Sequence, residues 1–198
     1  MPIQQRSEET RARLLQAAVE CFAQHGYDGT GVAEICEHAG VSKGAFYHHF
    51  PTKQAVFLAL LQSWLGGLDE QMAVLRSAAP TVPEALRQTA LIVPHILQAS
   101  TGQMPIYFEF VAKASREPDT WRATLEPYHR YHELFTHMIA AGIAEGSLRP
   151  VDPAAAAHAI LSFAVGLVLQ GVLDPHGADW ALVAQDSMEI LLKGLQVP

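Results

Sequence analysis

Apolar residues recur at helical spacing along almost the whole chain, and no stretch alternates apolar and polar residues as a half-buried strand does. In the first such segment, Leu15, Ala18, Val19 and Phe22 fall at positions i, i+3, i+4 and i+7, which places them on one helical face. With 198 residues, 49% of them hydrophobic, the chain can bury a core. The pattern predicts an all-α protein of about nine helices.

Glycine and proline mark where these helices begin and end. Gly26 and Gly146 follow apolar faces and end two helices, while Pro153 begins another behind Asp152. We expect helices over residues 8–25, 32–39, 43–49, from 52 onward, and over 83–101, 104–115, 118–145, 153–173 and 178–196. Pro94 and Pro127 fall inside two of these ranges and predict kinks, because each removes one backbone hydrogen bond.

The stretch Val41 to Phe50 reads VSKGAFYHHF and contains the most distinctive local pattern. Gly40 precedes it and suits a tight turn, and Ser42 can cap the short helix that follows. Two short helices joined by a glycine turn form a helix-turn-helix. From Gly40 through Lys53 there is no acidic residue, although the chain carries 20 Asp and Glu against 13 Lys and Arg.

The third helix has side chains suited to DNA. Lys43 lies at its N-terminus, where side chains reach base edges in the major groove, and Gly44 and Ala45 leave room for a close approach. The remaining polar side chains can donate to phosphates: Tyr47, His48, His49 and, in the next helix, Lys53. Capped short helices also occur in proteins that bind no DNA, so spacing alone leaves both interpretations open.

The run from Leu14 to Leu61 closely resembles the N-terminal domain of the TetR/AcrR family of transcriptional regulators. The shared residues are Phe22, Gly26, Tyr27, Ile35, Ala39, Gly40, Val41, Ser42, Tyr47, His49, Phe50 and Lys53. The resemblance implies a homodimer that binds a palindromic double-stranded DNA operator and is released by a small-molecule inducer. It favours a repressor over an activator. The polar and charged start of the chain predicts a cytoplasmic protein, and we expect no cofactor.

Carried over residue by residue, the resemblance implies a DNA-binding set, with Phe46 pointing into the core instead. The set comprises Thr30, Gly31, Ser42, Lys43, Gly44, Ala45, Tyr47, His48, His49 and Lys53. Gly31 stands where relatives have Thr or Ser, so Thr30 is left to supply that hydroxyl. Ala33 and Ala45 replace polar groups, so direct base contacts rest on Lys43 and His48.

We assign residues 1–53 to the helix-turn-helix domain and 54–198 to a ligand-binding and dimerisation domain. The first segment holds five basic and six acidic side chains, and the second holds eight and fourteen. The N-terminal segment is therefore the less repelled by a polyanion. With a Debye length of ~8 Å at physiological salt, acidic groups on a distant domain are largely screened from DNA.

Aromatic and polar residues concentrate in the middle of the chain. Such a stripe is typical of a plain core, but buried Tyr, His and Glu need partners, and the family places its inducer cavity among these helices. The expected ligand pocket comprises His95, Tyr107, Phe108, Glu109, Phe110, Trp121, Tyr128, Tyr131, His132 and Phe135.

Two other kinds of site fit parts of the same region. Glu109 and His132 can be imagined as an acid–base pair, but no nucleophile motif or phosphate loop accompanies them, so an enzyme is not favoured. Glu133 and His137 have the i, i+4 spacing of a two-ligand metal face, with His129 and His132 nearby. Solvated or pocket-lining histidines explain this cluster better, and we predict no metal.

The last two helices are apolar on nearly all sides, as expected where a second subunit covers them. The expected dimer interface comprises Ile160, Phe163, Gly166, Leu167, Trp180, Val183, Ser187, Ile190 and Leu191. The apolar run from Ala159 to Leu173 is interrupted and shorter than the ~20 residues that span a bilayer. We therefore predict no membrane association and no secretion signal.

Overall fold

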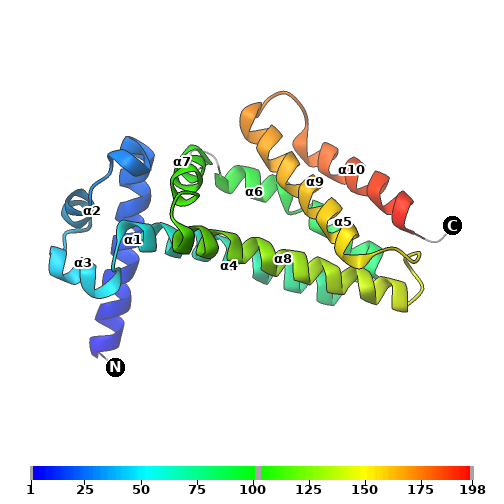
Figure 1. Ribbon diagram of the computed structural model, residues 1–198, viewed down its shortest axis with the longest axis horizontal. Coiled ribbons are helices and arrows are strands. Elements are labelled where there is room, and N and C mark those ends of the chain that lie inside the picture. The colour runs from blue at the N-terminus through cyan, green and yellow to red at the C-terminus, as the bar shows by residue number, and fades with distance from the viewer. Residues whose placement is uncertain (1, 101–103, 197–198) are drawn as a thin grey trace. The chain divides into compact units, whose positions relative to one another are not determined.

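The computed structural model describes residues 2–100 and 104–196 and confirms the all-α fold (Figure 1). Its helices are α1 (Pro2–Gly29), α2 (Val32–Ala39), α3 (Lys43–His49), α4 (Lys53–Ala78), α5 (Val82–Ala90), α6 (Val93–Ser100), α7 (Met104–Ala114), α8 (Pro118–Ala144), α9 (Pro153–Leu173) and α10 (Trp180–Leu195). In the described ranges the β-structure amounts to one isolated bridge, between Leu148 and Gln196.

The chain forms two compact units, and each unit contains two separate segments of the sequence. In the described residues, the first unit contains 2–65 and 104–125, and the second contains 66–100 and 126–196. Helices α4 and α8 each begin in the first unit and end in the second. Helix α7 therefore packs with the N-terminal helices, and the functional division at residues 53 and 54 stays a prediction.

The first unit is built on the apolar face of α1, against which α2 and α3 pack (Figure 1). Gly26 interrupts α1 with a left-handed backbone of φ 74°, so the predicted helix stop appears as a kink followed by one more turn. The rings of Phe57 and Phe110 stack at 3.9 Å, and Tyr27 meets Phe110 edge-on at 5.2 Å. This aromatic cluster joins α1, α4 and α7.

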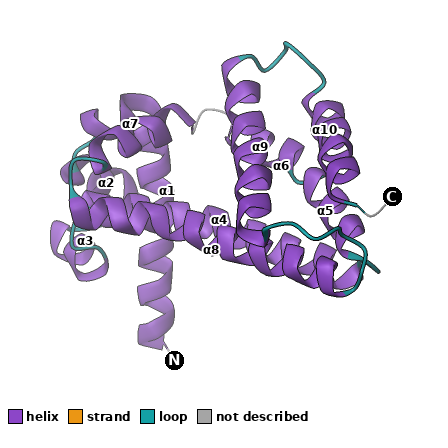
Figure 2. Ribbon diagram, turned by 45° about the vertical axis from the view of Figure 1, so that its right-hand side comes forward, coloured by secondary structure: helices purple, strands orange, loops and turns teal. Residues whose placement is uncertain are grey.

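In the second unit, α9 and α10 lie side by side and pack on α5 and α6 (Figure 2). Residues 83–101 were expected to form one kinked helix, but the described part of this range forms two, α5 and α6, which separate at Leu91 and Ile92. Pro94 has no N–H to continue the ladder, and the N–H groups of Leu91 and Ile92 bond three residues back, to Gln88 and Thr89. The expected kink is thus a break.

Helix α9 is long and apolar enough to cross a membrane by length and composition alone, with a mean hydropathy of 1.9. This corrects the expectation that its apolar run is too short. A third of the apolar window is buried within the chain. Single helices of this kind also occur in protein cores and interfaces, and Gly171 shows such packing: a Cβ there would lie 2.7 Å from Leu97 of α6.

Candidate functional site

Local contacts at both ends fix α3. The Oγ of Ser42 accepts a hydrogen bond from the backbone N–H of Ala45 at 3.1 Å, which confirms the predicted cap. Before it, Gly40 ends α2 with a left-handed backbone at φ 62°. The ring of Phe46 is fully buried and anchors α3 to the core. The helix therefore presents one defined face to solvent.

The exposed face of α3 carries most of the predicted DNA-binding residues. The side chain of Tyr47 is 57% exposed, although it is large and aromatic. Ser42, Lys43, Gly44 and His48 are exposed, and Ala45 and His49 are half-buried. A Cβ added at Gly44 would meet Ser42 Oγ at 3.7 Å, an ordinary contact, so packing does not demand glycine here. Its effect is to leave the surface beside Lys43 open.

Arg11 of α1, a basic residue outside the predicted DNA-binding set, lies beside the C-terminal end of α3. The guanidinium of Arg11 lies 5.3 Å from the centroid of the Phe50 ring, in cation–π contact. Burial lowers the pKa of His49 below its usual value, and the positive charges of His48 and Arg11 lower it further. In the sequence, the one feature that could have drawn attention to Arg11 is its position just before the apolar face of the first helix.

Thr30 does not present its hydroxyl to solvent, which corrects the expectation that it contacts DNA. Its side chain is 1% exposed, and its Oγ1 donates toward the carbonyls of Cys21 at 3.0 Å and Gly26 at 2.8 Å. These contacts tie the α1 kink to the start of α2. Gly31 is exposed and caps α2 through backbone only, with its N–H donating to Glu34 Oε2 at 3.3 Å.

Lys53 is bound to the loop between α1 and α2. Its ammonium donates to the carbonyls of Tyr27 at 2.5 Å and Thr30 at 2.7 Å, and lies 4.4 Å from the centroid of the Tyr27 ring. Burial lowers the pKa of Lys53, and the charge of nearby Lys113 adds to this effect. An ammonium has three protons, so one remains for a phosphate.

Glu109 holds α7 against the kink in α1. Its carboxylate accepts hydrogen bonds from the backbone N–H groups of Tyr27 at 2.8 Å and Asp28 at 2.7 Å. Lys113, one turn later, pairs with the Asp28 carboxylate. A Cβ at Gly26 would lie 2.9 Å from Glu109 Oε2, so glycine is needed for both its positive φ and this approach. Glu109 thus acts as a structural cap.

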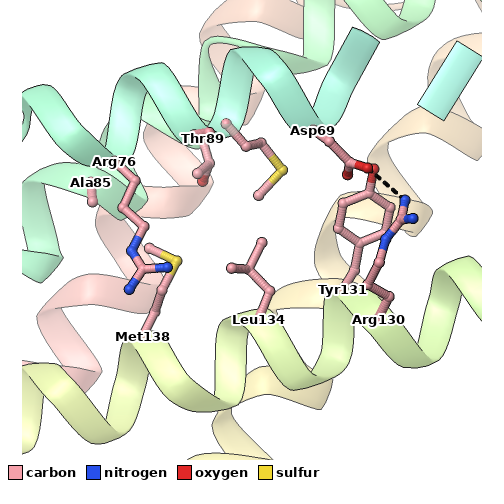
Figure 3. Close-up of a pocket in the computed structure, with 10 residues that line it drawn as sticks. Asp69, Arg76, Ala85, Thr89, Arg130, Tyr131, Leu134 and Met138 are labelled. Atoms are coloured by element: carbon pink, nitrogen blue, oxygen red, sulfur yellow. Dashed lines mark ion pairs between the residues drawn. The ribbon is translucent and has the colours of Figure 1, made fainter. Parts of the chain in front are cut away.

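The structure describes a cavity of about 250 Å³ between α4, α5 and α8, all within the second unit (Figure 3). Its walls are mostly apolar, with two arginines and one aspartate among them. The lining residues are Asp69, Met72, Ala73, Arg76, Ala85, Thr89, Arg130, Tyr131, Leu134 and Met138. Of the expected pocket residues, Tyr131 is part of this lining.

The other expected pocket residues lie outside this lining. Phe110 is buried in the aromatic cluster of the first unit, and Trp121 and Tyr107 pack against the same core. His95, Phe108 and Tyr128 are exposed, His132 is half-buried and Phe135 is buried. Among the expected residues of α8, Tyr131 and Phe135 are buried as helical spacing predicts, whereas Tyr128 is not. Helices α4 and α5, which supply six lining residues, carried no comparable signal.

The charges around the cavity are arranged at its two ends. Arg130 pairs with Asp69 at 2.7 Å, beside the ring of Tyr131 (Figure 3). Burial raises the pKa of Tyr131, and the neighbouring Asp69 carboxylate raises it further, so the phenol stays protonated. Arg76 lies at the other end, with Leu134 between the two (Figure 3). In the described ranges, the ion pair of this lining is that of Arg130, and Arg76 has no carboxylate partner.

The expected dimer residues point in two directions. Ile160 and Leu167 are buried within the second unit, whereas Phe163, Gly166, Trp180, Val183, Ser187 and Leu191 are partly exposed. Ile190 is 70% exposed. Four further large apolar side chains share this exposure and extend the set along both helices: Val165, Leu169, Leu173 and Leu182. The apolar surface left open is thus a stripe along α9 and α10.

His132, one of the histidines considered as metal ligands, makes other contacts. His132 Nε2 lies 3.2 Å from the carbonyl of Ala154, and its ring centroid lies 4.0 Å from that of His158. The hydroxyl of Tyr128 lies 3.2 Å from His158 Nδ1. Within the described ranges, no group of three or more His, Cys, Asp or Glu side chains could hold a metal ion.

Comparison with known proteins agrees with this architecture. Residues 14–60 match the family described as bacterial regulatory proteins, tetR family, and residues 83–193 match the BetI-type transcriptional repressor C-terminal family. The HTH-type transcriptional regulator AcrR of Shigella flexneri is 28% identical, over 96% of this chain and 90% of the relative.

Two solved structures share the fold at low identity. A putative transcriptional regulator from Pseudomonas aeruginosa PAO1 superposes with a TM-score of 0.82 at 22% identity, covering 98% of this chain and 91% of that one. The transcriptional regulator FadR from Bacillus subtilis, solved in complex with stearoyl-CoA, gives a TM-score of 0.76 at 22% identity, with coverage of 92% and 98%.

Proposed function

The chain belongs to the TetR/AcrR family of transcriptional regulators, and on that premise we propose that it is a repressor that binds a palindromic operator as a homodimer and is released by a small molecule. The relatives are named as transcriptional regulators, which supports a binding function rather than an enzymatic one. As a regulator of transcription, it acts in the cytoplasm. The BetI-type match over residues 83–193 supports repression.

The observation that carries this proposal is the exposed face of α3. Lys43, Tyr47 and His48 extend from a helix that is capped by Ser42 and anchored by buried Phe46. A helix held in this way can enter a major groove as one rigid element. Lys43 at its N-terminus is the candidate for base contacts, whereas Tyr47, His49 and the third proton of Lys53 are candidates for phosphate.

A homodimer would explain the exposed apolar stripe on α9 and α10. Val165 is 59% exposed and Ile190 70%, and covering large apolar groups is the main source of association free energy. Gly166 has no heavy atom within 4 Å of an added Cβ, so a partner helix can approach there. Two-fold pairing brings two α3 helices to one operator, about one DNA turn or ~34 Å apart.

The cavity between α4, α5 and α8 is the candidate inducer site. Its volume of about 250 Å³ and apolar lining with a few polar groups suit a small molecule. The stearoyl-CoA complex of the B. subtilis relative supports ligand binding in a protein of this fold. A ligand can release DNA only by the difference in its affinity for the bound and free conformations.

The proposal is tested by selecting genomic fragments that the purified protein retains and measuring binding by fluorescence anisotropy. We expect a palindromic consensus, two chains per operator and affinity that falls steeply with salt. Val165→Asp should give monomers in light scattering and weak operator binding, whereas the matched change Val74→Asp, at a valine of α4 that is 66% exposed, should remain dimeric. A preserved dimer in Val165→Asp would refute the interface, and absence of salt-sensitive DNA binding would refute the function.

A further inference from the structure

We propose that the cavity between α4, α5 and α8 takes a small amphipathic organic anion, with its acid group on Arg76 and its apolar body against Met72, Leu134 and Met138. The inducer role of such a ligand rests on the proposed function. The binding of the ligand does not rest on the proposed function, because its affinity can be measured on the protein without DNA.

The sign of the ligand charge follows from the three charged groups in the lining. Asp69 and Arg130 form an ion pair at 2.7 Å, so that end of the cavity is already neutralised. Arg76 remains as a single positive charge at the other end, without a carboxylate partner in the described ranges (Figure 3). A cation would meet Arg76 unopposed, whereas a carboxylate or phosphate can accept two of its N–H groups at once.

The apolar lining determines the polarity and size of the remainder of the ligand. Seven of the ten lining residues carry no charge, and Met72 and Met138 present flexible thioether side chains that adapt to varied shapes. The volume of about 250 Å³ equals that of roughly eight liquid waters, which corresponds to a molecule of roughly ten non-hydrogen atoms. A simple inorganic anion would leave this apolar surface without a partner.

The polar atoms near Tyr131 define what the far end accepts. The Tyr131 phenol lies beside the Asp69–Arg130 pair, so this end is polar but has no net charge. A neutral hydroxyl on the ligand fits beside Tyr131, but a second acid group is not required. On the α5 side of the cavity, the Thr89 hydroxyl donates to the carbonyl of Leu86 at 2.7 Å, which leaves its oxygen as an acceptor.

The experiment is isothermal titration of the full chain with three probes of equal chain length: octanoate, octanol and octylammonium. We expect octanoate to bind about tenfold more tightly than octanol, since one charged hydrogen-bond pair is gained, and octylammonium to bind most weakly. Arg76→Gln should reduce octanoate affinity to that of octanol and leave octanol unchanged. The matched control is Arg122→Gln, which removes the same charge from a side chain that is 81% exposed and outside the lining.

Equal binding of octanoate and octanol, stronger binding of octylammonium, or the absence of saturable binding by any probe would overturn the assignment. So would an Arg76→Gln variant that binds octanoate as Arg122→Gln does. Circular dichroism checks that both variants fold. Release of operator DNA is measured separately: octanoate that binds through Arg76 but releases no DNA would refute the inducer role and leave the anion site standing.

Discussion

Replacing Lys53 by Met separates the two roles that this residue can have, in folding and in DNA binding. Methionine keeps an apolar stem over the Tyr27 ring but removes the ammonium and its hydrogen bonds to the Tyr27 and Thr30 carbonyls. Each bond to a charged group contributes about 1.5–3 kcal/mol. Burial of the ammonium, which also lowers its pKa, offsets part of this sum.

We therefore expect Lys53→Met to lower the free energy of unfolding by about 2 kcal/mol, measured by urea denaturation. Lys113→Met is the matched control, because Lys113 also lies near the Tyr27 ring, at 5.8 Å, but its pair with Asp28 is exposed. Exposed pairs contribute about 0–1 kcal/mol. If the two variants unfold at equal free energy, the two carbonyl contacts do not stabilise the fold.

The DNA-binding role is read from the salt dependence of operator affinity. If the third proton of Lys53 contacts a phosphate, Lys53→Met should lower the slope of log K against log salt by about 0.9, and Lys113→Met should not change it. The measurement is made under conditions where both variants remain folded. An unchanged slope with reduced stability would show that Lys53 serves the α1–α2 loop alone.

Four further outcomes follow from the structure. Lys43→Ala should lose about 1–3 kcal/mol of discrimination at one or two base pairs, and uniform weakening on all sequences would contradict base contact. Gly26→Ala should lower the free energy of unfolding by about 2 kcal/mol, because of the positive φ and the close Glu109 carboxylate. A double-mutant cycle with Glu109→Ala should recover part of that loss. Glu109→Ala alone should lower the free energy of unfolding, because two backbone N–H groups lose their acceptor. The hydrogen bond from the Gly31 N–H, followed by the contact with His25, lowers the pKa of Glu34. The ionised Glu34 carboxylate therefore stabilises the fold above the ordinary pKa of 4.5, and this contribution is lost as pH falls through the folded-state pKa. In Glu34→Gln, the free energy of unfolding should depend less on pH in this range.

The helix-turn-helix could be predicted almost to the residue because its signals are local. Gly40 and Ser42 act within one turn of the chain, and α2 and α3 begin and end where the spacing predicts. The role of Glu109 could not be predicted in this way, because its partners Tyr27 and Asp28 lie more than eighty residues earlier. Helical spacing reports which face is buried, but not which segment covers it.

Most of the cavity lining was not predicted, apart from Tyr131, for a related reason. Aromatic residues drew the prediction toward 107–110, but Phe110 serves the core of the first unit. Six of the ten lining residues lie on α4 and α5, and among them Ala73, Ala85 and Thr89 have small side chains that leave space rather than fill it. A cavity depends on the volume that side chains do not occupy, and only the packed structure shows that volume.

The position of Arg76 has a consequence for how regulators of this kind diversify. Its exposed side chain has no carboxylate partner in the described ranges, so replacing it should cost the fold little. If Arg76 binds the acid group as proposed, its replacement by Gln or Leu would alter which ligands the cavity accepts while the face of α3 stays intact. A duplicated gene could in this way acquire a new signal before it acquires a new operator.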